Sequence, residues 1–354
     1  MDLLEHQGKE ILSRYGIETP RGTVVDTPES LPAVDIPLPW VLKAQVPAGG
    51  RMKAGGIRMA HSVKEARRAT DEMLGSSLHG CRVDRVLVEE QVPVDWEWYL
   101  CLTIDRSLRM PRLLFSRRGG IEVEETGEML QLPVNPLVGL QEHHLRRMEK
   151  PARPVARRLY RLFREMDCEL AEINPLAVVD GCPLALDAKI TVNHNALYRH
   201  PELPQHDPRL TPLEQEAQKM GLAFVQEEGE VGVIANGAGL TMATMDALQD
   251  YGARGLFLDL CGTDDARQVE RALSLMHRAG PRVILLNLFG GITKCDTVAR
   301  GVLSALEKGM DTPIVARIRG TNEEQARQML ADRVESHLSF QEAVHRTAAL
   351  GRGS

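Results

Sequence analysis

The apolar positions near the start of the chain follow the spacing of a helix. They are Leu4, Gly8, Ile11, Leu12 and Tyr15, and Gly16 followed by Pro20 is expected to end this helix. Apolar runs then predict a helix at 62–74 and strands at 40–46, 57–60, 85–92 and 98–104. This order of elements predicts a small α+β module.

The middle of the chain predicts a helix followed by a hairpin. An amphipathic pattern over 151–169 leads into a strand at 170–179. Asp180-Gly181 is a strong signal for a two-residue turn, so 182–190 is expected to return antiparallel to that strand. Residues 200–215 are rich in Pro, His and Asp and are interpreted as a linker.

Strand–turn–helix units repeat after residue 230. Apolar strands begin near Val231, Leu256, Val283 and Pro313, and a glycine-bearing turn and a helical stretch follow each one. This repetition predicts a parallel, doubly wound sheet that binds ligands at the carboxyl ends of its strands. The last helix is expected to begin at 320–324, where Thr321 and Glu324 have the spacing of a capping box.

Length and composition limit the class of protein. A chain of 354 residues suggests two or three domains at about 150 residues each. A net charge of −6 argues against binding nucleic acid by bulk electrostatics, and no apolar run approaches the length of about 20 residues that a membrane span needs. No secretion signal is visible at the start, and the six cysteines form no CxxC motif. We therefore expect a soluble cytosolic protein with reduced thiols.

A glycine-rich loop follows the strand at 40–46. Residues 47–56 contain four glycines together with Arg51 and Lys53. Backbone N–H groups and two basic side chains can surround a polyphosphate. The loop has neither the P-loop nor the GxGxxG pattern, so a solvated flexible loop is the alternative.

The hairpin predicts a possible metal site. If Val179 pairs with Cys182, Asn174 lies opposite Asp187 and Glu172 opposite Lys189, and alternation places these four side chains on one face. Amide and carboxylate oxygens side by side suit a Mg²⁺ ion that also holds phosphates. Polar cross-strand pairs on a wet face are the alternative.

Two loops of the predicted parallel sheet carry Asn and Gly, namely 236–242 and 287–293. Helix N-termini at such loops favour anions, so together the loops indicate an anion or carboxylate site, with ordinary turn glycines as the alternative. Cys261 is expected to be a passive thiol, because no histidine nearby in the sequence is set to activate it.

Eight segments in order resemble the β-subunit family of succinyl-CoA synthetase (succinate–CoA ligase) and malate–CoA ligase. They are 4–9, 15–16, 43–51, 53–56, 172–176, 195–201, 236–240 and 289–292. The resemblance implies an α/β chain with an ATP-grasp fold of two α+β lobes, followed by a flavodoxin-like, doubly wound parallel-sheet CoA-ligase domain. The implied divisions are a lobe with the metal site at 1–20 and 93–212, a nucleotide-binding lobe at 21–92, and the CoA-ligase domain at 213–354.

The resemblance also implies roles for particular residues. The residues implied at the nucleotide are Lys43, Gly50, Arg51, Met52, Glu89, Val92 and Glu97. Asn174 and Asp187 match the ligands of Mg²⁺, and Glu172 would orient a phosphohistidine of a partner α subunit. The residues implied at the carboxylate substrate are Asn236, Gly291, Ile292 and Thr293.

The implied reaction uses ATP to phosphorylate a histidine of the α subunit, which then activates a dicarboxylate for attack by the CoA thiol. This chain carries neither the phosphohistidine motif nor the CoA-binding unit of an α subunit, so it is expected to be inactive alone. Pro20 matches the ATP-using branch rather than the GTP-using one. The acid and the αβ or α2β2 assembly stay open.

The chain departs from the family pattern at four places. Met52 replaces a glycine, 260–263 replaces a run of glycines, the segment after 119–124 is several residues short, and Asn193-His194 replaces residues that are more commonly acidic. These departures support an alternative in which the chain is a divergent, non-catalytic or weakly nucleotide-binding partner subunit.

Overall fold

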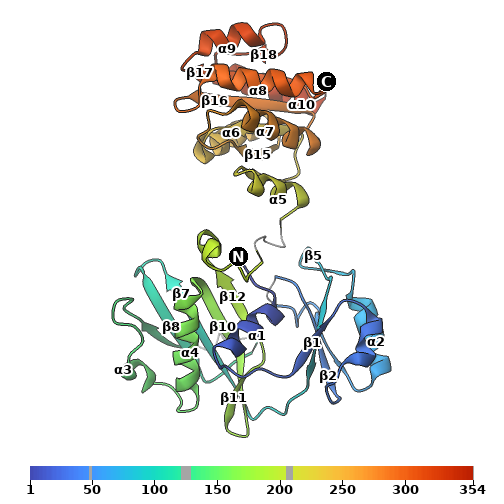
Figure 1. Ribbon diagram of the computed structural model, residues 1–354, viewed down its shortest axis with the longest axis vertical. Coiled ribbons are helices and arrows are strands. Elements are labelled where there is room, and N and C mark those ends of the chain that lie inside the picture. Colours follow the sequence, from blue (N-terminus) through green and yellow to red (C-terminus); the bar gives the residue numbers. More distant parts are fainter. Residues whose placement is uncertain (48–49, 121–128, 205–209, 354) are drawn as a thin grey trace. The chain divides into compact units, whose positions relative to one another are not determined.

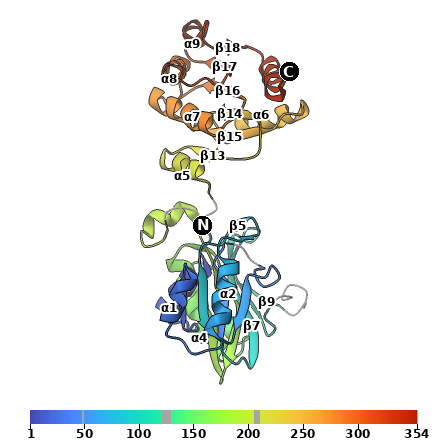
Figure 2. The ribbon, with the colours of Figure 1, turned by 90° about the vertical axis from the view of Figure 1, so that its right-hand side faces the viewer.

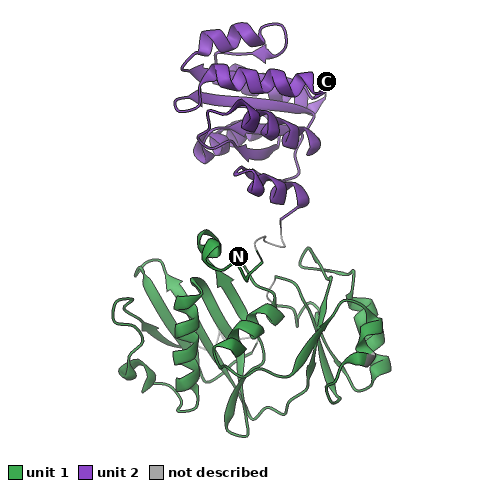
Figure 3. Cartoon of the chain, in the orientation of Figure 1, with its two compact units in different colours: residues 1–209 green, residues 210–354 purple. Residues whose placement is uncertain are grey.

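The computed structural model describes residues 1–47, 50–120, 129–204 and 210–353 (Figure 1). Ala48 and Gly49 of the predicted glycine-rich loop and residues 205–209 of the predicted linker lie outside the described residues. The chain divides into two compact units, Met1–Arg209 and Leu210–Ser354 (Figure 3).

The first sheet of unit 1 is antiparallel and has the strand order β1-β6-β2-β3. The strands are β1 (Gly22–Val25), β6 (Val86–Glu90), β2 (Trp40–Ala44) and β3 (Ile57–Ala60). Helix α2 (Val63–Met73) and the 3₁₀ helix η1 (Pro28–Ala33) pack on it, and β4 (Ser77–Leu78) pairs with β5 (Cys81–Arg82) nearby. Ser62 caps α2 by accepting the Glu65 backbone N–H, as its position before the apolar pattern suggests. The strands predicted at 40–46, 57–60 and 85–92 are confirmed.

The second sheet of unit 1 is also antiparallel, with the order β11-β10-β7-β8-β9 and with β12 pairing with β10. The strands are β7 (Trp96–Asp105), β8 (Met110–Ser116), β9 (Leu130–Pro133), β10 (Cys168–Val179), β11 (Cys182–Ala185) and β12 (Lys189–Val192). Helices α1 (Glu5–Arg14) and α4 (Ala152–Glu165) bury their apolar faces in the same core, through Leu12, Leu159 and Leu162. The short helices α3 (Glu142–Leu145) and η3 (His194–Arg199) complete this part.

The register predicted for the hairpin is confirmed. Val179 pairs with Cys182, and Glu172 pairs with Lys189. The predicted return strand is wrong in one respect, because it is interrupted at 186–188 and forms β11 and β12. The interruption faces Pro175, whose carbonyl accepts the Leu186 N–H and whose nitrogen has no hydrogen to donate to the ladder.

Unit 2 contains a parallel, doubly wound sheet, as predicted. The parallel strands are β14 (Val231–Ala235), β15 (Gly255–Asp259), β16 (Val283–Gly290), β17 (Ile314–Gly320) and β18 (Glu335–Ser336). Their order, β15-β14-β16-β17-β18, is that of flavodoxin-like sheets, and the antiparallel β13 (Ala223–Val225) extends the edge beside β15.

Helices cover both faces of this sheet (Figure 2). Helices α6 (Ala238–Asp250) and α10 (Phe340–Arg352) bury one core with β14, β16 and β17. The other core is covered by α5 (Pro212–Lys219), α7 (Ala266–Arg278), α8 (Cys295–Glu307) and α9 (Glu323–Leu330). None of the helices in the described ranges has both the length and the apolar character that a membrane crossing requires.

Two predictions for unit 2 are wrong in detail. The helix that begins near residue 320 is not the last, because α10 follows it. Its capping box does not form: Asn322 is the N-cap residue in a left-handed conformation, and the Glu323 carboxylate accepts the Gly320 N–H at 2.8 Å. The left-handed turn at Asn322 moves Thr321 out of the capping position.

Candidate functional site

Six charged side chains of unit 1 meet in a group that we call the charged cluster. Its members are Glu5 and Lys9 of α1, Lys43 of β2, Arg51 of the glycine-rich loop, Glu89 of β6, and Asp187 between β11 and β12. The first five are buried, and the Asp187 side chain is 32% exposed. Three cations balance three carboxylates, so the cluster is neutral when all six are ionised.

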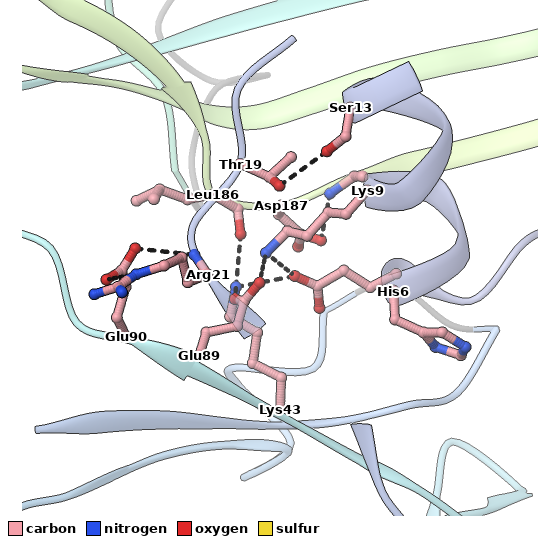
Figure 4. Close-up of polar contacts among 12 residues, drawn as sticks. His6, Lys9, Ser13, Thr19, Arg21, Lys43, Glu89, Glu90, Leu186 and Asp187 are labelled. Atoms are coloured by element: carbon pink, nitrogen blue, oxygen red, sulfur yellow. Dashed lines mark hydrogen bonds and ion pairs between the residues drawn. The ribbon is translucent and has the colours of Figure 1, made fainter. Parts of the chain in front are cut away.

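Lys43 and Lys9 are held by the same two carboxylates (Figure 4). The Lys43 ammonium lies 2.9 Å from Glu5 Oε1 and 2.8 Å from Glu89 Oε2, and it donates to the Leu186 carbonyl at 2.6 Å. The Lys9 ammonium lies 2.9 Å from Glu5 Oε1 and also contacts Glu89 Oε1. Helix α1 therefore supplies a carboxylate to Lys43 and a cation to Glu89.

Arg51 joins the glycine-rich loop to the second sheet. Its Nη2 donates to both carboxylate oxygens of Asp187, at 2.8 and 3.0 Å. Its Nη1 lies 2.6 Å from Glu5 Oε2 and donates to the Ala44 carbonyl at 3.2 Å. Every charged neighbour that these contacts give to Lys43 and Arg51 is a carboxylate, so both cations are neutralised within the protein.

The cluster shifts the pKa values of its members. Burial raises the pKa of Glu5, but Lys43, Lys9 and Arg51 outweigh burial and hold that pKa well below its usual value. Burial lowers the pKa of Lys43, but the nearby carboxylates, with Glu5 first, outweigh it and raise that pKa. For Lys9 burial prevails over Glu5, and its pKa is lowered. Glu5 and Lys43 therefore stay charged at neutral pH.

The glycine-rich loop accommodates Met52 without a left-handed backbone. Positive φ angles in the described part of the loop occur at Gly50 (70°) and Gly55 (75°), whereas Met52 does not adopt one and is 57% exposed. The loop closes through a hydrogen bond of 2.8 Å from the Gly56 N–H to the Arg51 carbonyl. The departure at Met52 thus falls at a position where a side chain causes no backbone strain.

A cavity of about 260 Å³ lies beside the charged cluster. Lys9 and Glu89 line it together with Pro20 and Leu87, and Ser13 and Thr19 add polar atoms. His6 and Glu10 also line it, so polar and charged side chains form most of its wall, with Pro20, Val24 and Leu87 as the apolar part. Val92 lies in the connection after β6, and Glu97 lies in β7.

The strand pairs on both sides, Leu176 with Ala185 and Glu172 with Lys189, place Asn174 opposite Asp187 at the interruption between β11 and β12. They lie on the side of the sheet away from the core, because Ile173 and Ala188 point into the core. Asn174 Oδ1 accepts the Gly120 N–H at 2.7 Å, and its Nδ2 donates to the Gly120 carbonyl at 3.2 Å. An amide oxygen with a second lone pair and a carboxylate fit the donor chemistry of Mg²⁺.

Protein atoms alone would not complete such a metal site. Within the ranges that the structure describes, no three His, Cys, Asp or Glu side chains come together as metal ligands. A Mg²⁺ ion here would take most of its ligands from water and phosphate, which is usual for this ion.

Glu172 has a hydrogen-bond donor that the sequence did not suggest. The Tyr99 hydroxyl of β7 donates to Glu172 Oε2 at 3.1 Å. Burial makes the largest contribution to raising the pKa of Tyr99, and the neighbouring Cys101 and Glu172 raise it further. The Tyr99 hydroxyl therefore stays protonated. Burial and then Glu172 raise the pKa of the Cys101 thiol to about 12. Glu172 therefore lies beside two neutral groups of β7 and opposite Lys189 of β12, on the same side of the sheet as Asn174.

Asn236 bridges the point in unit 2 where the strand order reverses. Its Nδ2 donates to the Phe289 carbonyl at 2.7 Å, and its Oδ1 accepts the Phe289 N–H at 2.9 Å. It thus ties the end of β14 to the end of β16, where doubly wound sheets bind ligands. Asn287, placed in a loop by the sequence analysis, lies inside β16, is fully buried and contacts Thr244 and Arg317.

The loop after β16 lies beside the loop after β15. Gly291 and Ile292 are exposed, with Ile292 at 78%, whereas Thr293 is buried and its hydroxyl accepts the Thr263 N–H at 3.3 Å. The Asp259 carboxylate accepts the Gly237 and Cys261 N–H groups, at 2.6 and 2.8 Å. Asn236 and residues 291–293 therefore occupy the same carboxyl edge of the sheet.

Comparisons with known proteins agree with both units. The model of the ATP-grasp domain matches residues 2–178, and the CoA-ligase model matches residues 234–349. The β subunit of the ADP-forming succinate–CoA ligase of Rubrobacter xylanophilus is 40% identical over 97% of this chain and 96% of that protein. That of Ignicoccus hospitalis is 41% identical over 94% of each chain.

A solved structure supports the same fold over nearly the full length. The ATP citrate lyase of Methanothrix soehngenii, solved with citrate and coenzyme A, covers 98% of this chain and 98% of its own, with a TM-score of 0.78 and 18% identity. The identity is low, so this likeness bears on the fold alone.

Proposed function

The chain belongs to the family of ADP-forming succinate–CoA ligase β subunits, and on that premise we propose that it uses ATP, with an α subunit, to join a dicarboxylic acid to coenzyme A. Succinate is the first candidate acid. The observation that supports this function is the charged cluster, which holds Lys43 and Arg51 close to Asp187 and whose members Lys9 and Glu89 line the neighbouring cavity.

ATP occupies the cavity of unit 1 in this proposal. Its base and ribose lie along Pro20 and the segment from Glu89 to Val92, with Glu97 facing the nucleotide. Its phosphates bind to the side chains of Lys43 and Arg51 and to the backbone N–H groups of Gly50 and Met52. Phosphoryl transfer depends mostly on positioning and on neutralising charge, and buried cations that are already in place do both.

Asn174 and Asp187 would hold Mg²⁺. The ion would neutralise charge on the phosphates and bridge them to the protein. Asp187 would do this only after its carboxylate exchanges Arg51 for the metal, since both of its oxygens now accept from the guanidinium.

Glu172 receives the partner's histidine in this proposal. The Glu172 carboxylate accepts a hydrogen bond from one imidazole N–H, and this orients the other ring nitrogen toward the γ-phosphorus of ATP. A P–N bond forms, the bond from phosphorus to the β,γ-bridging oxygen breaks, and ADP leaves. Tyr99, fixed as a neutral donor, holds the Glu172 carboxylate in one orientation.

The acid site is assigned to unit 2 and the α subunit together. Asn236 with Gly291, Ile292 and Thr293 would border the carboxylate, because the N–H groups at the start of α6 and the loop after β16 lie at the same edge.

We assign the two ATP-grasp lobes to 1–20 with 93–212 and to 21–92, and the CoA-ligase domain to 213–354. Six free cysteines support a cytoplasmic location.

The test is to co-purify the full chain with an α subunit and to assay ATP-dependent CoA-thioester formation over a panel of dicarboxylic acids. Thioester formation with one of them, accompanied by ADP release, is expected. A complex that forms no thioester with any acid would refute the proposal. The non-catalytic alternative is not favoured, because Met52 is unstrained and the charged residues of the site are all in place.

A further inference from the structure

Helix α1 contributes two charges to the nucleotide site that the sequence analysis did not assign to it. Glu5 is 3% exposed and Lys9 is 5% exposed. Glu5 contacts the three cations of the cluster: Oε1 lies 2.9 Å from both the Lys9 and the Lys43 ammonium, and Oε2 lies 2.6 Å from Arg51 Nη1. No other carboxylate of the cluster has contacts to all three.

The position of Glu5 gives it two opposite effects. A buried cation without a counter-charge is strongly unfavourable, so the carboxylate of Glu5 stabilises Lys43 and Arg51 where they lie. The same carboxylate competes with any anion for these two cations. Phosphate groups that approach Lys43 and Arg51 must therefore replace, or share, their contacts with Glu5.

We propose that Glu5 is a positioning residue of the nucleotide site, which holds Lys43 and Arg51 in place before ATP binds and lowers the affinity for ATP by neutralising them. Lys9 is the counter-charge that keeps the cluster neutral in this arrangement. The inference rests on the proposed function, since it concerns the same nucleotide site.

Charge-changing substitutions separate this role from a purely structural one. Glu5→Gln leaves the cluster with one excess positive charge, whereas Glu5→Asp keeps the charge. Lys9→Gln leaves one excess negative charge, and the double variant Glu5→Gln/Lys9→Gln is neutral again. Glu72→Gln on α2 is the matched control, because it removes an exposed carboxylate that pairs with Arg58 outside the cluster.

The measurement is calorimetric binding of ATP–Mg²⁺ and of inorganic tripolyphosphate to the full chain, with melting temperatures recorded in the presence and absence of each. Glu5→Gln should melt lower without ligand, bind both probes about three- to tenfold more tightly, and show a larger ligand-induced rise in melting temperature than the wild type. Glu5→Asp and Glu72→Gln should bind as the wild type does. Lys9→Gln should bind more weakly, and the double variant should return close to wild-type affinity.

A folded Glu5→Gln protein with unchanged or weaker affinity for both probes would overturn the proposal. A double variant as weak as Lys9→Gln would also overturn it, because Lys9 would then act by touching the nucleotide itself. If Glu5→Gln does not fold, Lys9→Gln becomes the deciding variant. An affinity of Lys9→Gln for tripolyphosphate equal to that of the wild type would then overturn the proposal.

Failure of the proposed function gives a different result. A wild-type chain that binds neither probe and supports no thioester formation with an α subunit removes the function. A wild-type chain that binds ATP, with variants that bind equally well, leaves the function standing and removes only the role of Glu5.

Discussion

Asp187 belongs to both the charged cluster and the proposed metal site, so the substitution Asp187→Asn tests the two together. The variant keeps the shape of the side chain and one oxygen that can accept from Arg51, but it loses the negative charge. Arg51 retains Glu5 and the Ala44 carbonyl as partners. We expect the fold to persist with reduced stability and metal-dependent turnover to be lost.

The stability loss can be estimated from the exposure of the pair. An exposed ion pair contributes up to about 1 kcal/mol, and breaking a buried one costs about 3–5 kcal/mol. Because the Asp187 side chain is 32% exposed, Asp187→Asn should lower the unfolding free energy by about 1–2 kcal/mol, closer to the value for an exposed ion pair than to that for a buried one. For a unit of this size that corresponds to a fall of about 2–8 °C in melting temperature.

The effect on the metal should be larger than the effect on the fold. Removing an outer-shell partner of a ligand already costs about 10- to 100-fold in metal affinity, and removing a ligand charge should cost at least as much. The assay is ATP-dependent phosphorylation of the α subunit as a function of Mg²⁺ concentration, with scanning calorimetry alongside. Asp180→Asn is the control, because Asp180 is an exposed turn residue of the same hairpin with a φ of 49°, which Asn tolerates. Wild-type turnover of Asp187→Asn at ordinary Mg²⁺ would remove Asp187 from the metal site.

Four further outcomes are expected. Met52→Gly should leave ATP affinity within about twofold, because Met52 is exposed and has no positive φ, and should lower stability by less than about 1 kcal/mol; a large gain in calorimetric affinity would show that the methionine damages the loop. Tyr99→Phe should slow phosphorylation of the α subunit about tenfold with unchanged ATP affinity, since it removes one hydrogen bond to Glu172; an equal loss of affinity would contradict the role given to Glu172. Asn236→Ala should raise the KM for the acid while ATP still phosphorylates the α subunit. If the variant instead blocks this phosphorylation, Asn236 does not act in the acid site. The stability that ionised Glu5 contributes is present above the pKa of Glu in the unfolded chain, about 4.3, and is lost as the pH falls through its depressed folded pKa. The difference in unfolding free energy between wild type and Glu5→Gln should therefore stay constant from pH 7 to about 5 and shrink below about 4.3, as measured by denaturant unfolding; a difference that grows on acidification would contradict this reasoning.

The hairpin shows where sequence reasoning works best. A two-residue Asp-Gly turn sets the register of both strands, and alternation sets the face of each side chain. Asn174, Asp187 and Glu172 could therefore be placed together from the sequence, and the structure confirms the strand pairs on both sides of them, Leu176 with Ala185 and Glu172 with Lys189. The break at 186–188 escaped prediction because it depends on the pairing of the strand with Pro175.

The charged cluster shows where sequence reasoning stops. Glu5 and Lys9 are four residues apart on a predicted helix, a spacing that usually indicates an exposed pair. Nothing in the sequence shows that this pair is buried against Lys43, Glu89 and Arg51, since these contacts join residues 38 to 80 positions apart in the chain. Tyr99 was missed for the same reason, because its contact with Glu172 joins residues 73 positions apart on two neighbouring strands.

The sequence by itself determined the family, the α/β class, the hairpin register and the parallel sheet of unit 2, because these follow from short motifs, turn chemistry and local periodicity. Only the tertiary structure decided which charges neutralise one another, that Asn287 is buried inside β16 rather than exposed in a loop, and that Asn322 rather than Thr321 begins α9. The physical reason is that burial and ion pairing depend on distances between chain segments. Those distances are set when the sheets and helices pack, and the order of residues along the chain does not contain them.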